Sequence, residues 1–162
     1  MKKMIFIGLL VLATMSFGQK NEIGINPLHF ISGLGMSYER FATTHFSFGV
    51  AGTVGLFRFQ NQKTNYMVLP FVRYYFKNDF RGFFIHGGYY TDEVKQLQES
   101  GWLFGHPKRK VHHSGPLIGA GGKILLGKNF AVNLYLAAGP DLNEVELVPI
   151  VMDGIATLTY RF

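Results

Sequence analysis

The amino-acid sequence predicts an all-β chain that forms an up-and-down antiparallel eight-stranded transmembrane β-barrel. Three observations support this prediction. After residue 20, segments that alternate between apolar and small or polar residues recur between turn signals, and no stretch of twelve residues has helical periodicity. One face of these segments has almost no Lys, Asp or Glu at its centre, unlike a sheet that faces water. The connections between them alternate between short and long.

The chain is long enough for one domain, so one architecture should account for all of it. The expected strands lie near residues 21–29, 33–41, 45–56, 65–77, 82–91, 115–126, 130–139 and 153–162. Short turns are expected at 42–44, 78–81 and 127–129, and long connections at 57–64, 92–114 and 140–152. Outer-membrane barrels have short periplasmic turns and long extracellular loops, which matches this alternation.

The segment 130–139 illustrates the two faces. Phe130, Leu134 and Leu136 fall on one side, and Asn133 and Tyr135 fall on the other, because side chains alternate along a strand. We interpret the apolar side as the lipid-facing one. A soluble lipocalin-like barrel that carries a hydrophobic ligand would reverse this arrangement, and periodicity alone does not choose between the two.

The first eighteen residues predict a cleaved signal peptide. Lys2 and Lys3 precede an apolar segment that runs from Met4 to Met15, and small residues follow at 16–18. The barrel domain would then occupy residues 19–162. The chain has no cysteine, so neither disulfides nor a lipid on a terminal cysteine accompany the predicted export.

The last strand ends in Tyr160-Arg161-Phe162, which resembles the signal by which outer-membrane barrels engage their assembly machinery. The segments 25–28 (INPL), 35–40 (GMSYER) and 46–50 (FSFGV) resemble the opening of small outer-membrane β-barrel families with OmpA- or OmpX-like architecture. This resemblance implies a location in the outer membrane of a Gram-negative bacterium, and it assigns no activity.

Polar residues on the faces opposite the apolar ones should point into the barrel. An eight-stranded barrel is just wide enough for its own side chains, so we expect Glu39 to pair there with Arg73, Lys123 or Arg161 and to leave no open pore. The complete set expected inside is Glu22, Asn26, Glu39, Arg73, His86, Lys123, Asn133 and Arg161.

The long connection 92–114 contains the basic run Lys108, Arg109 and Lys110. At the outer rim of a barrel, these residues could bind the phosphates of lipopolysaccharide. Alternatively, they could pair with the acidic residues Asp141, Glu144 and Glu146 of the connection 140–152.

We expect a monomer without enzymatic activity, metal or cofactor, whose partners are outer-membrane lipid and the assembly machinery rather than nucleic acid. A lipid A-modifying enzyme is the catalytic alternative, because His112 and Ser114 resemble the His-x-Ser of outer-membrane lipid A deacylases. Gly115 stands where that family has Asn. His106, His112 and His113 do not predict a metal site, because adjacent residues on a strand point to opposite faces.

Overall fold

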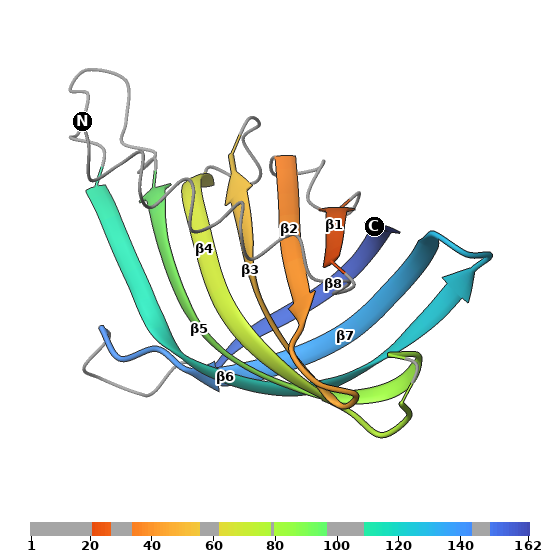
Figure 1. Ribbon diagram of the computed structural model, residues 1–162. Helices are drawn as coiled ribbons and strands as arrows, with labels where there is room; N and C mark the ends of the chain where they lie inside the picture. The colour runs from red at the N-terminus through yellow and green to blue at the C-terminus, as the bar shows by residue number, and fades with distance from the viewer. Residues whose placement is uncertain (1–20, 27–33, 56–61, 79, 97–108, 144–149) are drawn as a thin grey trace, which may run out of the picture.

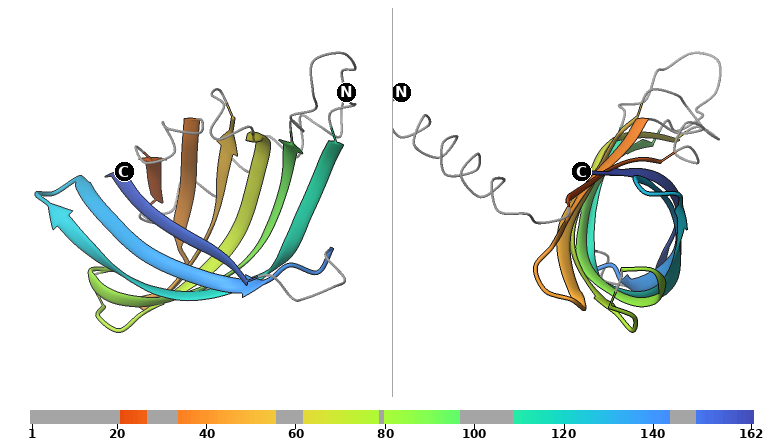
Figure 2. Two further views of the ribbon diagram at one scale, coloured as in Figure 1. Left: turned by 180° about the vertical axis from the view of Figure 1, so that it is seen from behind. Right: turned by 45° about the vertical axis from the view of Figure 1, so that its right-hand side comes forward.

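The computed structural model describes residues 21–26, 34–55, 62–78, 80–96, 109–143 and 150–162, and it forms a closed barrel of eight antiparallel strands (Figure 1). Each strand pairs with its neighbours in the chain, and the first pairs with the last. The right-hand view of Figure 2 looks along the barrel. The predicted fold class is therefore confirmed. The strands are β1 (Asn21–Asn26), β2 (Leu34–Phe41), β3 (Phe46–Val54), β4 (Gln62–Tyr75), β5 (Gly82–Gln96), β6 (Arg109–Leu126), β7 (Phe130–Pro140) and β8 (Ile150–Arg161).

The barrel has two distinct ends. The turns 42–45, 76–81 and 127–129 lie at one end, which we call the turn end. The opposite ends of the strands, such as Asn26, Leu34 and Val54, lie at the other, which we call the loop end. Gly127 has a φ of 79°, a left-handed conformation that glycine adopts without strain in a tight turn. Asn21 and Phe162 meet at the turn end, where they exchange two backbone hydrogen bonds of 2.9 Å. The predicted signal peptide, residues 1–18, lies outside the described residues.

Strands β4 to β8 extend further toward the loop end than the sequence predicted, and β1 to β3 extend less far. The bounds predicted for the connection 92–114 were wrong, because β5 continues to Gln96 and β6 begins at Arg109. β4 likewise begins at Gln62 and β8 at Ile150, whereas β1 ends at Asn26. The hydrogen-bonded ladder continues because polar residues such as Glu93 and His112 can pair across strands as well as apolar ones do.

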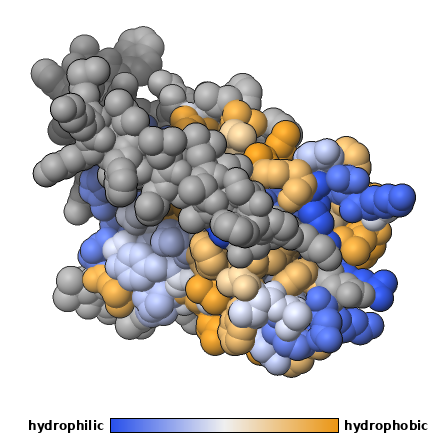
Figure 3. Space-filling model, in the orientation of Figure 1, coloured by the Kyte–Doolittle hydropathy of each residue, from blue (hydrophilic) through white to orange (hydrophobic). Residues whose placement is uncertain are grey.

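The outward side of the barrel is apolar. Ile118 and Leu136 are 71% and 72% exposed, and aliphatic and aromatic side chains occupy many of the outward positions of the strands whose side chains are described. Figure 3 shows apolar side chains across the middle of one face and hydrophilic ones at its ends. No helix in the described parts of the chain is long and apolar enough to cross a membrane.

Aromatic side chains encircle much of the outer surface near the turn end. Several of their rings touch, including Phe46 with Tyr74 at 5.0 Å between centroids and Phe130 with Tyr160 at 5.3 Å. Rings of this kind mark the boundary between hydrocarbon and headgroups in membrane barrels. This turn-end aromatic belt consists of Phe46, Tyr74, Phe76, Phe83, Phe130, Tyr160 and Phe162.

Candidate functional site

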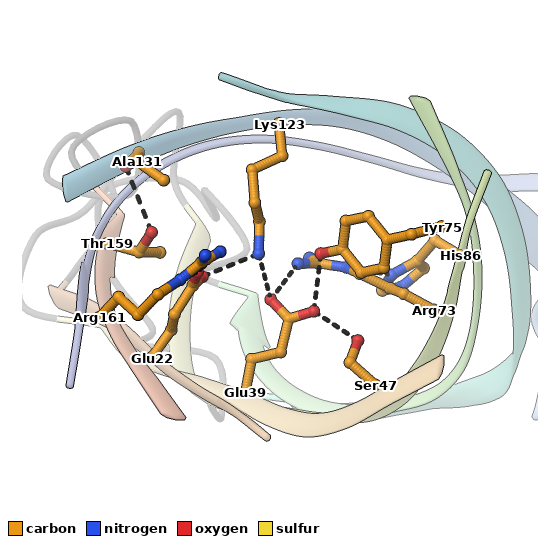
Figure 4. A network of polar contacts seen from close by, with 10 residues as sticks. All are labelled: Glu22, Glu39, Ser47, Arg73, Tyr75, His86, Lys123, Ala131, Thr159 and Arg161. Atoms are coloured by element: carbon orange, nitrogen blue, oxygen red, sulfur yellow. Dashed lines mark hydrogen bonds and ion pairs between the residues drawn. The ribbon is translucent and has the colours of Figure 1, made fainter. Parts of the chain in front are cut away.

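The interior of the barrel holds a group of charged and polar side chains, which we call the lumen cluster (Figure 4). Its members come from six different strands, and period-two alternation turns each of them inward. Five are at least 95% buried, and the Arg161 side chain is 11% exposed. The lumen cluster consists of Glu22, Glu39, Arg73, His86, Lys123 and Arg161.

Glu39 is the hub of the lumen cluster. Its Oε2 accepts hydrogen bonds from Arg73 Nη1 at 2.8 Å and from Lys123 Nζ at 3.1 Å. Its Oε1 accepts from the hydroxyls of Tyr75 at 2.8 Å and Ser47 at 2.5 Å. Both oxygens of this buried carboxylate are therefore satisfied, and both cations beside it are neutralised.

Glu22 joins the first strand to the last. Its Oε1 accepts hydrogen bonds from Arg161 Nη2 at 2.6 Å and Nε at 2.8 Å, and its Oε2 accepts from Lys123 Nζ at 2.8 Å. Glu22 and Arg161 stand opposite each other in the β1–β8 ladder. Arg161 pairs with Glu22 and not with Glu39, which was one of the pairings expected from the sequence. Lys123 bridges the two carboxylates and so connects all the ion pairs.

Aromatic rings balance the excess positive charge of the lumen cluster. Three cations share two carboxylates, and each cation lies over the face of at least one ring, where the ring quadrupole attracts it. The Arg73 guanidinium carbon is 4.4 Å from the centroid of Phe71, 4.7 Å from that of Phe84 and 5.2 Å from that of Tyr135. The remaining contacts are Lys123 with Phe41 (4.7 Å) and Tyr75 (5.0 Å), and Arg161 with Phe41 (5.1 Å).

His86 is the neutral end of the lumen cluster. Arg73 Nε donates to His86 Nδ1 at 3.3 Å, so Nδ1 acts as an acceptor. The His86 ring stacks on Tyr135, with 4.6 Å between centroids and 19° between planes. Its Nε2 has no hydrogen-bond partner among the described residues.

Asn26 and Asn133, the other two residues expected inside, are 5% and 1% exposed and line a cavity of about 20 Å³. Arg73 and Tyr135 line the same cavity. It has room for one water and none for a hydrophobic ligand. The side-chain oxygen of Asn133 has no partner among the described residues, and a water there would satisfy it.

A second polar group, the outer rim cluster, lies on the outward face near the loop end and consists of Asn65, Glu93, Lys110 and His112. The Glu93 carboxylate lies 3.3 Å from Lys110 Nζ and 3.3 Å from His112 Nε2, and it accepts a hydrogen bond from Asn65. Among the described residues, the acidic partner of Lys110 is therefore Glu93, whereas Asp141 contacts His113. The Lys110 side chain is 57% exposed.

The structure shows less about Lys108 and Arg109, the other two residues of the expected basic run. Arg109 is the first residue of β6, and Lys108 lies outside the described residues. Glu144 and Glu146 also lie outside them. The structure therefore brings together only Lys110 and an acidic partner on the neighbouring strand.

The inner rim pair, His113 and Asp141, lies near the loop end on the inward side of β6. His113 Nδ1 is 2.5 Å from Asp141 Oδ2, and Asp141 Oδ1 accepts from the backbone N–H groups of Ser114 and Asn143 at 3.2 and 3.0 Å. Burial raises the pKa of the Asp141 carboxyl, but these hydrogen bonds outweigh it, so the pKa lies below its usual value. Asp141 thus ties the end of β7 to β6.

The geometry around His112 and Ser114 agrees only in part with the catalytic alternative. His112 and Ser114 lie on the same face of β6, and Glu93 contacts His112. The Ser114 hydroxyl instead accepts hydrogen bonds from Asn143 Nδ2 at 3.0 Å and Tyr89 Oη at 3.4 Å. His112 and Ser114 are not hydrogen-bonded to each other where the structure describes them.

The histidines in the described part of the chain do not gather as a metal centre would require. His112 and His113 point to opposite faces of β6 and contact different carboxylates. The described residues contain no group of three or more His, Asp or Glu side chains that could hold a metal ion. His106 lies outside the described residues.

Sequence reasoning missed several contributors to these sites. Tyr75 and Ser47 bind Glu39, and both occupy inward positions that alternation could have indicated. Glu93 was assigned to a loop. Its pairing with His112 follows from the register of β5 and β6 once both strands are extended.

The sequence matches no known protein family, and no curated protein is significantly similar to it. The structure is similar to the crystal structure of the N-terminal β-barrel domain of Pseudomonas aeruginosa OprF, with a TM-score of 0.64 and 15% sequence identity. The match covers 88% of this chain and 97% of that domain. The likeness establishes a shared fold, the β-barrel.

Proposed function

We propose that this chain is a bacterial outer-membrane barrel with a structural or surface-interaction role and no open pore. The observation that carries the proposal is the inversion of polarity: charged side chains lie inside and apolar side chains lie outside. In water, such an outer surface would be a large exposed apolar area, whereas lipid covers it without cost. A soluble carrier of a hydrophobic ligand would need the opposite arrangement.

The absence of a pore follows from the lumen cluster. Lys123 and Glu22 have fully buried side chains and pair at 2.8 Å, and Glu39 and Arg73 pair at the same distance beside them. A permeating ion would have to separate these pairs in a low-dielectric interior, which costs several kcal/mol per uncompensated charge. The plug would therefore brace the wall and block passage.

In this proposal the turn end faces the periplasm and the loop end faces the outside. Lys110 would then lie at the cell surface, where lipopolysaccharide phosphates could compete with Glu93 for its ammonium group. The assembly machinery would recognise the terminal Phe162, and the barrel would act as a monomer.

The test combines cell fractionation with electrophoresis of the detergent-extracted protein, heated and unheated. We expect to recover the protein in the outer-membrane fraction. The unheated protein should migrate faster than the heated protein, and the purified protein should show no conductance in planar bilayers. Recovery in the soluble periplasm would contradict the membrane assignment, and steady single-channel conductance would contradict the plug.

A lipid-ester hydrolase is the second candidate, favoured by the contact between Glu93 and His112 on the face that carries Ser114. His112 would take the proton of the Ser114 hydroxyl as its oxygen attacks the ester carbonyl, the alcohol would leave, and water would later release the acid. Expression of the wild-type protein should then remove an acyl chain from lipid A, and Ser114→Ala should abolish that mass change. An unchanged lipid A profile with the wild type would exclude this candidate.

A further inference from the structure

The outward face of β1–β4 contains an apolar groove that the proposed function does not use. Its volume is about 420 Å³, and Ile23, Met36, Tyr38, Val50 and Val68 surround it. The groove exists because Gly52, between Met36 and Val68 in the ladder, carries no side chain. A Cβ added at Gly52 would meet only the carbonyl oxygen of Met67, at 3.6 Å, so the space beside Gly52 is open.

Arg40 places a positive charge on the same face, two residues nearer the turn end than Tyr38. Arg40 follows Tyr38 by two residues on β2, which places their Cα atoms about 7 Å apart along the strand. Arg40 pairs with Phe48 in the ladder, and Phe48 is 48% exposed, so Arg40 also faces outward. The hydroxyl of Tyr38, which lines the groove, donates to Asn21 Oδ1 at 2.9 Å.

The height of Arg40 corresponds to the headgroups of the adjacent leaflet. Phe48 neighbours Phe46, a member of the turn-end aromatic belt, and rings of this kind sit at the membrane interface. The sequence of the turns at this end adds three basic residues, Lys77, Arg81 and Lys128, against one acidic residue, Asp79. An anionic headgroup is therefore the complementary one at this level.

We propose that this groove and Arg40 form a binding site for one anionic phospholipid of the leaflet at the turn end. One acyl chain lies in the groove beside Gly52, and the phosphate accepts charge-assisted hydrogen bonds from Arg40. The lining favours an acyl chain over a protein side chain, because the groove is aliphatic along most of its wall and offers no hydrogen-bond partner besides Tyr38. This inference rests on the proposed membrane location.

The test is native mass spectrometry of the purified barrel, released from micelles that contain phosphatidylglycerol or phosphatidylethanolamine. The wild type should retain one phosphatidylglycerol. Gly52→Leu fills the groove and should lower the retained fraction about tenfold, and Arg40→Gln should lower it similarly and remove the preference for phosphatidylglycerol.

Gly87→Leu is the matched control. Gly87 also faces outward, and a Cβ there would meet no atom within 4 Å, but it does not line the groove. Gly87→Leu should retain the lipid as the wild type does, and each variant should keep its heat-dependent mobility shift.

Two outcomes would overturn the site while the proposed function stands: a folded wild type that retains no phosphatidylglycerol, or equal retention by Gly52→Leu and Gly87→Leu. Retention of phosphatidylethanolamine as strong as that of phosphatidylglycerol would overturn the role of Arg40. A wild type that does not insert into bilayers would instead overturn the proposed function, and this site with it.

Discussion

The lumen cluster and the outer rim cluster use the same kinds of ion pair in opposite surroundings. The side chains of Lys123 and Glu22 are fully buried, whereas the Lys110 side chain is 57% exposed beside Glu93. Water reaches Lys110 and screens its pair with Glu93, although the Glu93 side chain is only 10% exposed, so this pair should contribute little to stability. Removal of one buried partner leaves a charge that nothing solvates. This difference indicates that burial, rather than the distance between the two charges, decides how much an ion pair stabilises this barrel.

The largest effect should come from Glu39→Gln. This change removes the carboxylate that neutralises Arg73 and part of Lys123 while it keeps the shape of the side chain. We expect a loss of about 3–5 kcal/mol in the free energy of unfolding. Urea titration of the detergent-solubilised barrel, followed by its electrophoretic mobility, would measure the loss. The control is Glu93→Gln in the outer rim cluster, which should leave the urea concentration at the midpoint of unfolding unchanged. Equal shifts of this midpoint for both variants would contradict the comparison.

Lys123→Met should have a smaller effect. Each carboxylate then keeps one arginine, Glu22 with Arg161 and Glu39 with Arg73, so no buried carboxylate becomes isolated. We expect a loss of about 1.5–3 kcal/mol, measured by the same titration. In a double-mutant cycle, Lys123→Met and Glu39→Gln should be non-additive because the two side chains touch. Additive losses would show that the network does not act as a unit.

Asp141→Ala tests the inner rim pair, and its effect should be local. The free energy of unfolding should fall by about 1 kcal/mol although the Asp141 side chain is buried, because the site lies at the end of the barrel and can open locally. The amides of Ser114 and Asn143 donate to Asp141 and should exchange with solvent faster. Hydrogen exchange followed by mass spectrometry would measure this, with amides in the middle of β6 as the internal reference. Faster exchange throughout β6 would contradict a local role.

The smallest effect concerns pH. The pKa of Asp141 is lower in the folded chain than its usual value, so its hydrogen bonds stabilise the loop end above the usual aspartate pKa of about 3.9. That contribution is lost as pH falls through the lower folded pKa. The protection factor of the Ser114 amide should be constant from neutral pH to about pH 4 and decrease below it. A decrease that begins near neutral pH would identify another group as the cause.

The sequence predicted the fold well, and period-two alternation indicated which residues share a face. The choice of the inward face also depended on the near absence of Lys, Asp and Glu from the other face. The sequence predicted the pairing less well. Arg161 was expected to share Glu39, but the register between β1 and β8 places it opposite Glu22. The extent of β5 and β6 was also underestimated, since a ladder can continue through polar residues such as Glu93 and His112 once it leaves the apolar band. Register and strand length depend on contacts between distant segments, which alternation does not encode.

The meeting of β1 and β8 has a consequence for how the chain folds. Only four residue pairs join the described parts of these strands, and the ion pair across them links residues 139 positions apart in the chain. Contacts of such separation carry the greatest loop-closure entropy and form late in folding. The other strands can pair as successive hairpins, but Glu22 meets Arg161 only when the ring closes. We therefore expect ring closure to be among the last events of folding, and until it occurs both edge strands are exposed to pairing with other chains.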